Sequence, residues 1–171
     1  MGLGEQLDYR YPQRNAFRSS LHKVASSRPG AWLMSKSIRF LDRLALSLTK
    51  GRTTVSEVVA GLPVIDVTTT GAKSGQPRTA QLFGIPTEGN LAILGTGFGL
   101  QKTPGWVFNL ISNPRASVTY RNRTVDVTAR RAEGAEADDI WATARELYDG
   151  YAAYRVRASH REIVVFVLEP E

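Results

Sequence analysis

Hydrophobic and β-branched residues occur in short runs along the chain from residue 63 onward, and several of these runs alternate with polar residues. Alternation with a period of two is typical of strands that bury one face. We therefore predict strands over residues 64–70, 78–85, 90–96, 115–121, 123–131 and 163–168. Two short helices are expected, over 103–112 and 135–147. This order predicts a mainly β domain of the α+β class, a small antiparallel barrel with helices packed outside.

A different pattern precedes this domain. Residues 1–30 are expected to be polar and irregular. Within 32–48, apolar residues recur at spacings of four and three, which predicts an amphipathic helix. We therefore divide the chain into an N-terminal arm with an amphipathic helix, residues 1–62, and a barrel domain, residues 63–171.

Charge separates the same two parts. The chain has 171 residues, 22 Lys and Arg, and 16 Asp and Glu, for a net charge of +6. Residues 1–62 hold 10 basic and 4 acidic residues, so the whole excess lies in the arm. Three interpretations stay open: the basic helix packs on the barrel, lies on an anionic membrane, or is a solvated surface. Nucleic acid is not expected as a partner, because aromatic residues are not interleaved with the arm's cations.

Neither a signal peptide nor a membrane-spanning stretch is recognisable. We expect a cytoplasmic protein, with peripheral contact to the inner face of the cell membrane through the arm as a further expectation. The chain has no cysteine and only His22 and His160, which excludes disulfides, thiolate nucleophiles, iron–sulfur clusters and multi-histidine metal sites. No acid–base pair is evident either, so the chemistry of an enzyme with this sequence would belong to a bound cofactor.

Two glycine-containing segments are candidates for holding that cofactor. The loop 71–77 carries Lys73 and Ser74 and is followed by Arg78, which suits a phosphate. An ordinary glycine hairpin with exposed charges explains the same pattern equally well. The second segment runs from Gly95 into a helix expected to have Thr103 as N-cap and Pro104 at its first position.

A third candidate is the tyrosine series that follows the predicted helix over 135–147. If that helix continues, Tyr148, Tyr151 and Tyr154 share one of its edges and could line a substrate slot. Three half-buried core tyrosines are the simpler alternative.

The first two segments carry a family resemblance. The run from Thr68 to Arg78 (TTTGAKSGQPR) and the run from Lys102 to Pro114 (KTPGWVFNLISNP) resemble the two motifs of the deazaflavin-dependent nitroreductase family, at matching separation. The resemblance covers about residues 63–170. It implies a split β-barrel like that of FMN-binding oxidoreductases, the deazaflavin coenzyme F420 as cofactor, and hydride transfer to a quinone, enone or nitro compound.

The resemblance also implies the residues of the site. Tyr151 matches a tyrosine of the substrate pocket and is the catalytic candidate, with Tyr148 and Tyr154 beside it. Gln81, Ala72 and Gly97 depart from the family pattern and leave fewer charges for the cofactor. The implied cofactor-binding residues are Ala72, Lys73, Ser74, Arg78, Thr79, Leu82, Phe83, Leu94, Gly95, Thr96, Gly97, Gly105, Trp106, Val107, Phe108 and Asn109.

Two alternatives keep the same barrel. One holds FMN in place of F420, and the other is a non-catalytic carrier of a coenzyme or lipid. Neither a monomer nor a homodimer is excluded, and no metal is expected.

Overall fold

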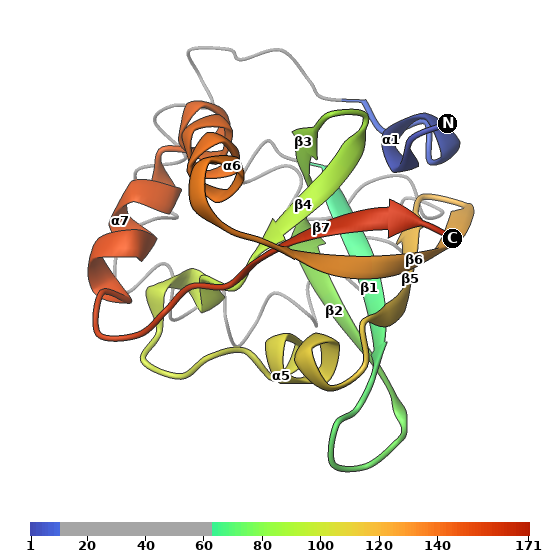
Figure 1. Ribbon diagram of the computed structural model, residues 1–171, viewed down its shortest axis with the longest axis horizontal. Coiled ribbons are helices and arrows are strands. Elements are labelled where there is room, and N and C mark those ends of the chain that lie inside the picture. Colours follow the sequence, from blue (N-terminus) through green and yellow to red (C-terminus); the bar gives the residue numbers. More distant parts are fainter. Residues whose placement is uncertain (11–62) are drawn as a thin grey trace, which may run out of the picture.

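The computed structural model describes residues 1–10 and 63–171, and its main element is a curled antiparallel sheet (Figure 1). The strands follow the order β2-β1-β5-β6-β7-β4-β3. They are β1 (Val64–Thr70), β2 (Pro77–Phe83), β3 (Ile85–Thr87), β4 (Asn90–Leu94), β5 (Arg115–Tyr120), β6 (Arg123–Ala132) and β7 (Val165–Pro170). The helical elements are α1 (Leu3–Gln6), η1 (Gly97–Gly99), α5 (Gly105–Ser112), α6 (Gly134–Leu147) and α7 (Gly150–Arg157).

The hydrophobic pattern explains how this sheet is covered. In β1, Ile65 and Val67 are buried on one face, while Asp66 and Thr68 are half-buried on the other. The strands β4 and β7 are apolar on both faces because two core clusters enclose them. Ile93 and Phe166 pack in the cluster inside the barrel, whereas their neighbours in sequence pack in a second cluster against α6 and α7. The prediction of a mainly β domain with flanking helices is confirmed.

The N-terminal segment packs on the barrel core through Leu3 and Leu7. Leu3 and Leu7 are 0% and 1% exposed and pack in the cluster inside the barrel. The Leu3 amide donates to the Asn90 side-chain oxygen at 3.0 Å. The Tyr9 hydroxyl donates to the carbonyls of Pro63 and Gly84 at 3.0 and 2.9 Å. The expectation of an irregular N-terminus is therefore wrong for α1.

Both helix boundaries near the candidate site differ from the prediction. Helix α5 begins at Gly105 with Pro104 as its N-cap, so the assignment of Thr103 as cap and Pro104 as first helical residue is one position early. Helix α6 does not continue through the tyrosines, because Tyr148 is extended, with φ of −150°. A Cβ on Gly150 would lie 2.1 Å from the Tyr148 ring, so that ring excludes a side chain at the first residue of α7.

Strand β3 is a seventh strand that the pattern did not predict; it is only three residues long and includes Pro86. The helix expected over 32–48 lies outside the described residues, and the division of the chain at residue 63 stays a prediction. Among residues 1–10 and 63–171, no helix is long and apolar enough to cross a membrane.

Candidate functional site

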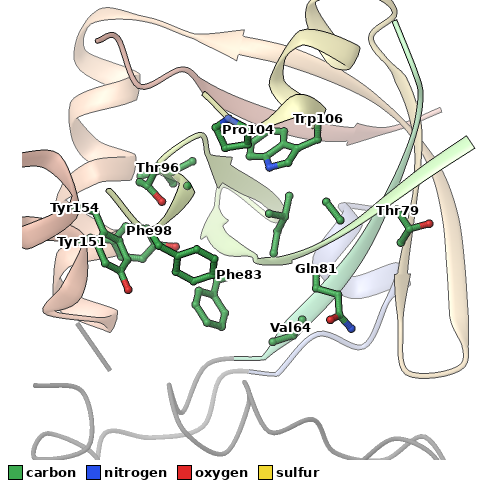
Figure 2. Close-up of a pocket in the computed structure, with 14 residues that line it drawn as sticks. Val64, Thr79, Gln81, Phe83, Thr96, Phe98, Pro104, Trp106, Tyr151 and Tyr154 are labelled. Carbon is green, nitrogen blue, oxygen red and sulfur yellow. The ribbon is translucent and has the colours of Figure 1, made fainter. Parts of the chain in front are cut away.

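An apolar cavity of about 250 Å³ lies between the edge strand β2 and the end of β4 (Figure 2). Trp106 and Pro104 form one wall, Tyr151 and Tyr154 of α7 lie at one end, and Thr79 lies at the opposite side. The volume is near the lower end of small-molecule sites, about 300–1,000 Å³, so the cavity suits a planar ring system rather than a whole coenzyme. The lining residues are Val64, Thr79, Ala80, Gln81, Leu82, Phe83, Leu94, Thr96, Gly97, Phe98, Pro104, Trp106, Tyr151 and Tyr154.

The β1–β2 loop has the compact form that the glycines at its ends suggest. The Gly71 amide donates to the Gln76 carbonyl at 2.9 Å, and the Gly75 amide donates to the Gly71 carbonyl at 2.8 Å. Gly75 has φ of +65°, a conformation that glycine adopts freely. A Cβ on Gly71 would lie 2.6 Å from the Ser74 hydroxyl oxygen and 3.1 Å from the Gln76 carbonyl oxygen, so a larger residue there would crowd the loop.

Asn109 ties this loop to helix α5. Its Oδ1 accepts the Ala72 amide at 3.0 Å, and its Nδ2 donates to the Thr69 hydroxyl oxygen at 2.9 Å. The Thr69 hydroxyl in turn donates to the Arg78 carbonyl at 3.2 Å. Asn109 therefore holds the first side of the loop directly and is linked to the second side through the Thr69 hydroxyl. Asn109 was expected among the cofactor-binding residues, but local sequence does not display its contact with residue 72, which lies 37 positions earlier in the chain.

The loop presents cations to solvent. Lys73, Ser74 and Arg78 are exposed. In the part of the chain that the structure describes, neither Lys73 nor Arg78 forms an ion pair with a carboxylate, whereas four other arginines do. Exposed cations beside backbone amides suit an anion such as phosphate. Strand β2 connects this loop directly to the cavity, because its residues 79–83 form one cavity wall.

The tyrosines are nearly fully buried. Tyr148, Tyr151 and Tyr154 are 2%, 4% and 3% exposed, with ring centroids about 6 Å apart. Tyr151 and Tyr154 line the cavity, whereas Tyr148 lies behind them with its hydroxyl 3.2 Å from that of Tyr154. Burial raises the pKa of Tyr148 and of Tyr154, so both phenols stay protonated at neutral pH.

The structure divides the predicted cofactor residues into three groups. Those of the loop and its anchor, Ala72, Lys73, Ser74, Arg78 and Asn109, lie at the end of the β1–β2 hairpin. Gly95, Gly105, Val107 and Phe108 do not line the cavity; Val107 is buried in the core, and Phe108 is 55% exposed. The third group lines the cavity and consists of Thr79, Leu82, Phe83, Leu94, Thr96, Gly97 and Trp106.

The set of site residues implied by the sequence left out several residues of this region. Gln81 was noted only as a departure from the family pattern, but it faces the same side of β2 as Thr79 and Phe83, which the period of a strand predicts. Phe98 stands between two glycines, which is a local signal for an unusual backbone. Arg161 has no local signal, because the carbonyls that it holds around η1 lie 61 to 66 residues away. Val64, Ala80 and Pro104 also line the cavity and were not among the implied site residues.

No cluster of three His, Asp or Glu side chains that could hold a metal ion occurs among the described residues. The donor set of the site is instead a backbone loop with cations next to an apolar cavity. This combination suits an organic cofactor with a phosphate and a flat ring.

The open, curled sheet beside an apolar cavity is a split β-barrel, a fold that a solved F420-H2 dependent reductase shares. Within this fold class, the family model described as F420H(2)-dependent quinone reductase matches residues 43–170. The chain belongs to this family. The predictions of the fold, of an F420-dependent oxidoreductase and of coenzyme F420 as cofactor are thereby confirmed.

Individual relatives agree with the family. The F420H(2)-dependent quinone reductase Rv1261c of Mycobacterium tuberculosis is 32% identical over 109 residues, which cover 62% of this chain and 72% of that protein. A solved structure described as an F420-H2 dependent reductase (FDR-A) is 39% identical with a TM-score of 0.57, covering 63% of this chain and 94% of that one. Another, described as a domain-swapped dimer, is 34% identical with a TM-score of 0.59, covering 82% and 99%.

Proposed function

We propose that this protein reduces a quinone with F420H2, and that the cofactor lies along β2 with its ring in the cavity and its phosphate on the loop 71–77. The observation that carries the proposal is the arrangement of the two sites on one strand. Residues 79–83 of β2 line the apolar cavity, and the exposed loop with Lys73 and Arg78 lies at the start of the same strand. The family supports the cofactor, and the name of the mycobacterial relative supports a quinone as acceptor.

The residues of the loop and of the cavity fit coenzyme F420. The loop offers exposed cations and a backbone that Asn109 holds in place, and both favour an anion. The cavity offers aromatic and aliphatic walls, including Trp106 and Phe83, and these favour a flat ring and exclude water. When bound, F420H2 supplies the hydride. The protein therefore has to orient the cofactor ring and the acceptor, and to supply one proton to the reduced acceptor.

Tyr151 is proposed to supply that proton to the acceptor. Its ring lies at the end of the cavity and is held edge to face by Tyr148, Tyr154 and Trp141, with centroid distances of 5.9 to 6.2 Å. A phenol fixed in this way can donate a hydrogen bond to the acceptor oxygen as negative charge develops there, and then supply the proton.

Fluorescence titration of the purified protein with F420 and with FMN, side by side, tests the cofactor. Turnover of F420H2 with a panel of quinones, enones and nitroaromatics tests the acceptor. Saturable F420 binding with quinone reduction supports the proposal. Tight FMN binding with none for F420 would overturn it in favour of the flavin alternative, and F420 binding without turnover would indicate a carrier.

Replacing both loop cations, Lys73→Ala with Arg78→Ala, is expected to weaken F420 binding at least about tenfold, because two charge-assisted contacts to the phosphate are lost. The same titration measures the effect. The matched control removes two surface arginines far from the loop, Arg131→Ala with Arg145→Ala, and should leave the affinity within about twofold, as surface pairs contribute little. Equal affinities for the two double variants would contradict the assignment of the loop.

We further propose that the arm brings the protein to an anionic membrane, where a lipid quinone is available. The support is the charge of the arm and the amphipathic helix expected over 32–48, which lies outside the described residues. Reversing Lys36, Arg39 and Arg43 to glutamate is expected to abolish sedimentation with anionic liposomes, while F420 affinity stays within about twofold. Sedimentation that survives the reversal, or wild-type protein that stays in the supernatant, would refute membrane binding. Cytoplasmic location and oligomeric state stay predictions.

A further inference from the structure

Phe98 has a backbone conformation that residues with a side chain rarely adopt. Its φ is +59° and its ψ is 20°, within η1, and its neighbours Gly97 and Gly99 have φ of +53° and +74°. Three successive left-handed residues are unusual, and the two glycines adopt this conformation without penalty. A bulky residue at the centre is disfavoured. Such a conformation persists only where the surroundings impose it, and it is found most often at functional sites.

Arg161 makes most of the contacts that hold Phe98 in its left-handed conformation. Its guanidinium donates to the Gly95 carbonyl at 3.0 Å and to the Thr96 carbonyl at 2.7 Å, just before η1. The same group donates to the Leu100 carbonyl, from Nη2 at 3.3 Å and from Nε at 3.4 Å, just after η1. It also donates to the carbonyl of Glu162 at 3.4 Å. One side chain thus holds the backbone on both sides of Phe98.

Arg161 has no carboxylate partner among the described residues, in contrast to the arginines of the surface ion pairs. Partial burial lowers its pKa, but its usual value is so high that the group stays charged at neutral pH. A planar guanidinium with five donors can bridge several carbonyls at once, which a lysine ammonium cannot match in geometry. The arrangement therefore depends on arginine in particular.

The result is an aromatic side chain at the cavity. Phe98 lines it, and its ring meets the Tyr154 ring edge to face at a centroid distance of 6.1 Å. In Figure 2 the rings of Phe98 and Phe83 lie next to each other, on the side of the cavity away from Trp106. A Cβ on Gly99 would lie 3.0 Å from the Arg157 Cβ and 3.2 Å from the Tyr154 Cα, so η1 packs closely against α7.

We propose that Phe98 is a specificity-determining residue for the acceptor and that Arg161 is the positioning residue that holds it in place. Phe98 and Phe83 supply apolar aromatic surface, which favours an acceptor with fused planar rings over a single small ring. The inference rests on the proposed function, because it concerns the acceptor of the same site. The strained backbone is then explained by the position it gives the ring.

The test compares 1,4-naphthoquinone, with two fused rings, and 1,4-benzoquinone, with one, as acceptors for F420H2. Phe98→Asn is the main variant, since asparagine tolerates the left-handed conformation. It is expected to lower kcat/KM for naphthoquinone about tenfold and that for benzoquinone less than about threefold. The affinity for F420 should stay within about twofold. Phe98→Tyr should restore the preference, and Val156→Ala, an exposed apolar residue of α7, serves as control.

Arg161→Lys keeps the charge but loses the bridging geometry, and it is expected to reduce the same preference by a similar factor. Arg145→Lys, an exposed arginine of α6, is its control. The inference about Phe98 is wrong if the wild type reduces both quinones and Phe98→Asn leaves the ratio of their kcat/KM values unchanged. It is equally wrong if Phe98→Asn weakens F420 binding tenfold while this ratio stays the same. If wild-type protein reduces neither quinone, the proposed function fails first. An Arg161→Lys protein with unchanged preference would overturn the positioning role alone.

Discussion

Replacing Tyr151 by phenylalanine is expected to lower kcat for quinone reduction by about a hundredfold, the lower end of the range for loss of a general acid. The substitution removes only the phenol oxygen. The ring keeps its edge-to-face contacts with Tyr148, Tyr154 and Trp141, so the cavity wall should keep its shape. Affinity for F420, measured by fluorescence titration, is therefore expected to stay within about twofold. Steady-state kinetics at saturating F420H2 gives kcat and KM separately.

Tyr120→Phe is the matched control for this variant. Tyr120 is also a buried tyrosine, 3% exposed, but it packs against Tyr9 in the cluster inside the barrel and does not line the cavity. Its replacement should leave kcat within about twofold. If Tyr151→Phe turns over at the wild-type rate with unchanged cofactor affinity, the acceptor receives its proton from another source, and Tyr151 is a wall residue only.

The strands were the most predictable part of this protein. The alternation in β1 and in the β5–β6 hairpin records one buried and one open face, and the predicted ranges match the observed ones within one or two residues. The apolar runs of β4 and β7 were equally predictable, because strands that are covered on both faces need apolar residues throughout. These features are local, so a single sequence displays them.

The positions that the sequence did not reveal depend on distant partners. The break before α7 lies at Tyr148, whose extended backbone no periodicity displays, and the closeness of its ring to Gly150 appears only in the fold. The role of Asn109 depends on a loop 37 residues earlier, and that of Arg161 depends on carbonyls more than 60 residues earlier. The motif resemblance supplied the cofactor, many of the cavity residues and Asn109 as a residue of the site. It did not supply the contacts through which Asn109 and Arg161 position the backbone.

The N-terminal residues were misjudged for a related reason, and they carry the largest expected effect on stability. Four residues make too short a helix to show an apolar stripe, so α1 resembles a polar tail in sequence. In the structure, Leu3 is fully buried inside the barrel, and a Cβ on Gly2 would lie 2.2 Å from the Gly89 carbonyl oxygen. The beginning of the chain therefore closes one end of the barrel against the β3–β4 turn.

Leu3→Ala is accordingly expected to lower the free energy of unfolding by about 2–5 kcal/mol, the usual cost of emptying a buried leucine site. For a chain of this length, that corresponds to a decrease of at least about 4 °C in the midpoint of thermal unfolding, measured by circular dichroism. Glu5→Ala, on the exposed side of the same helix, should change the midpoint by less than about 2 °C. Equal midpoints for the two variants would show that α1 does not close the barrel in solution. A large loss for Leu3→Ala alone would mean that truncations meant to probe the basic arm must keep residues 1–9, since otherwise they report on barrel stability.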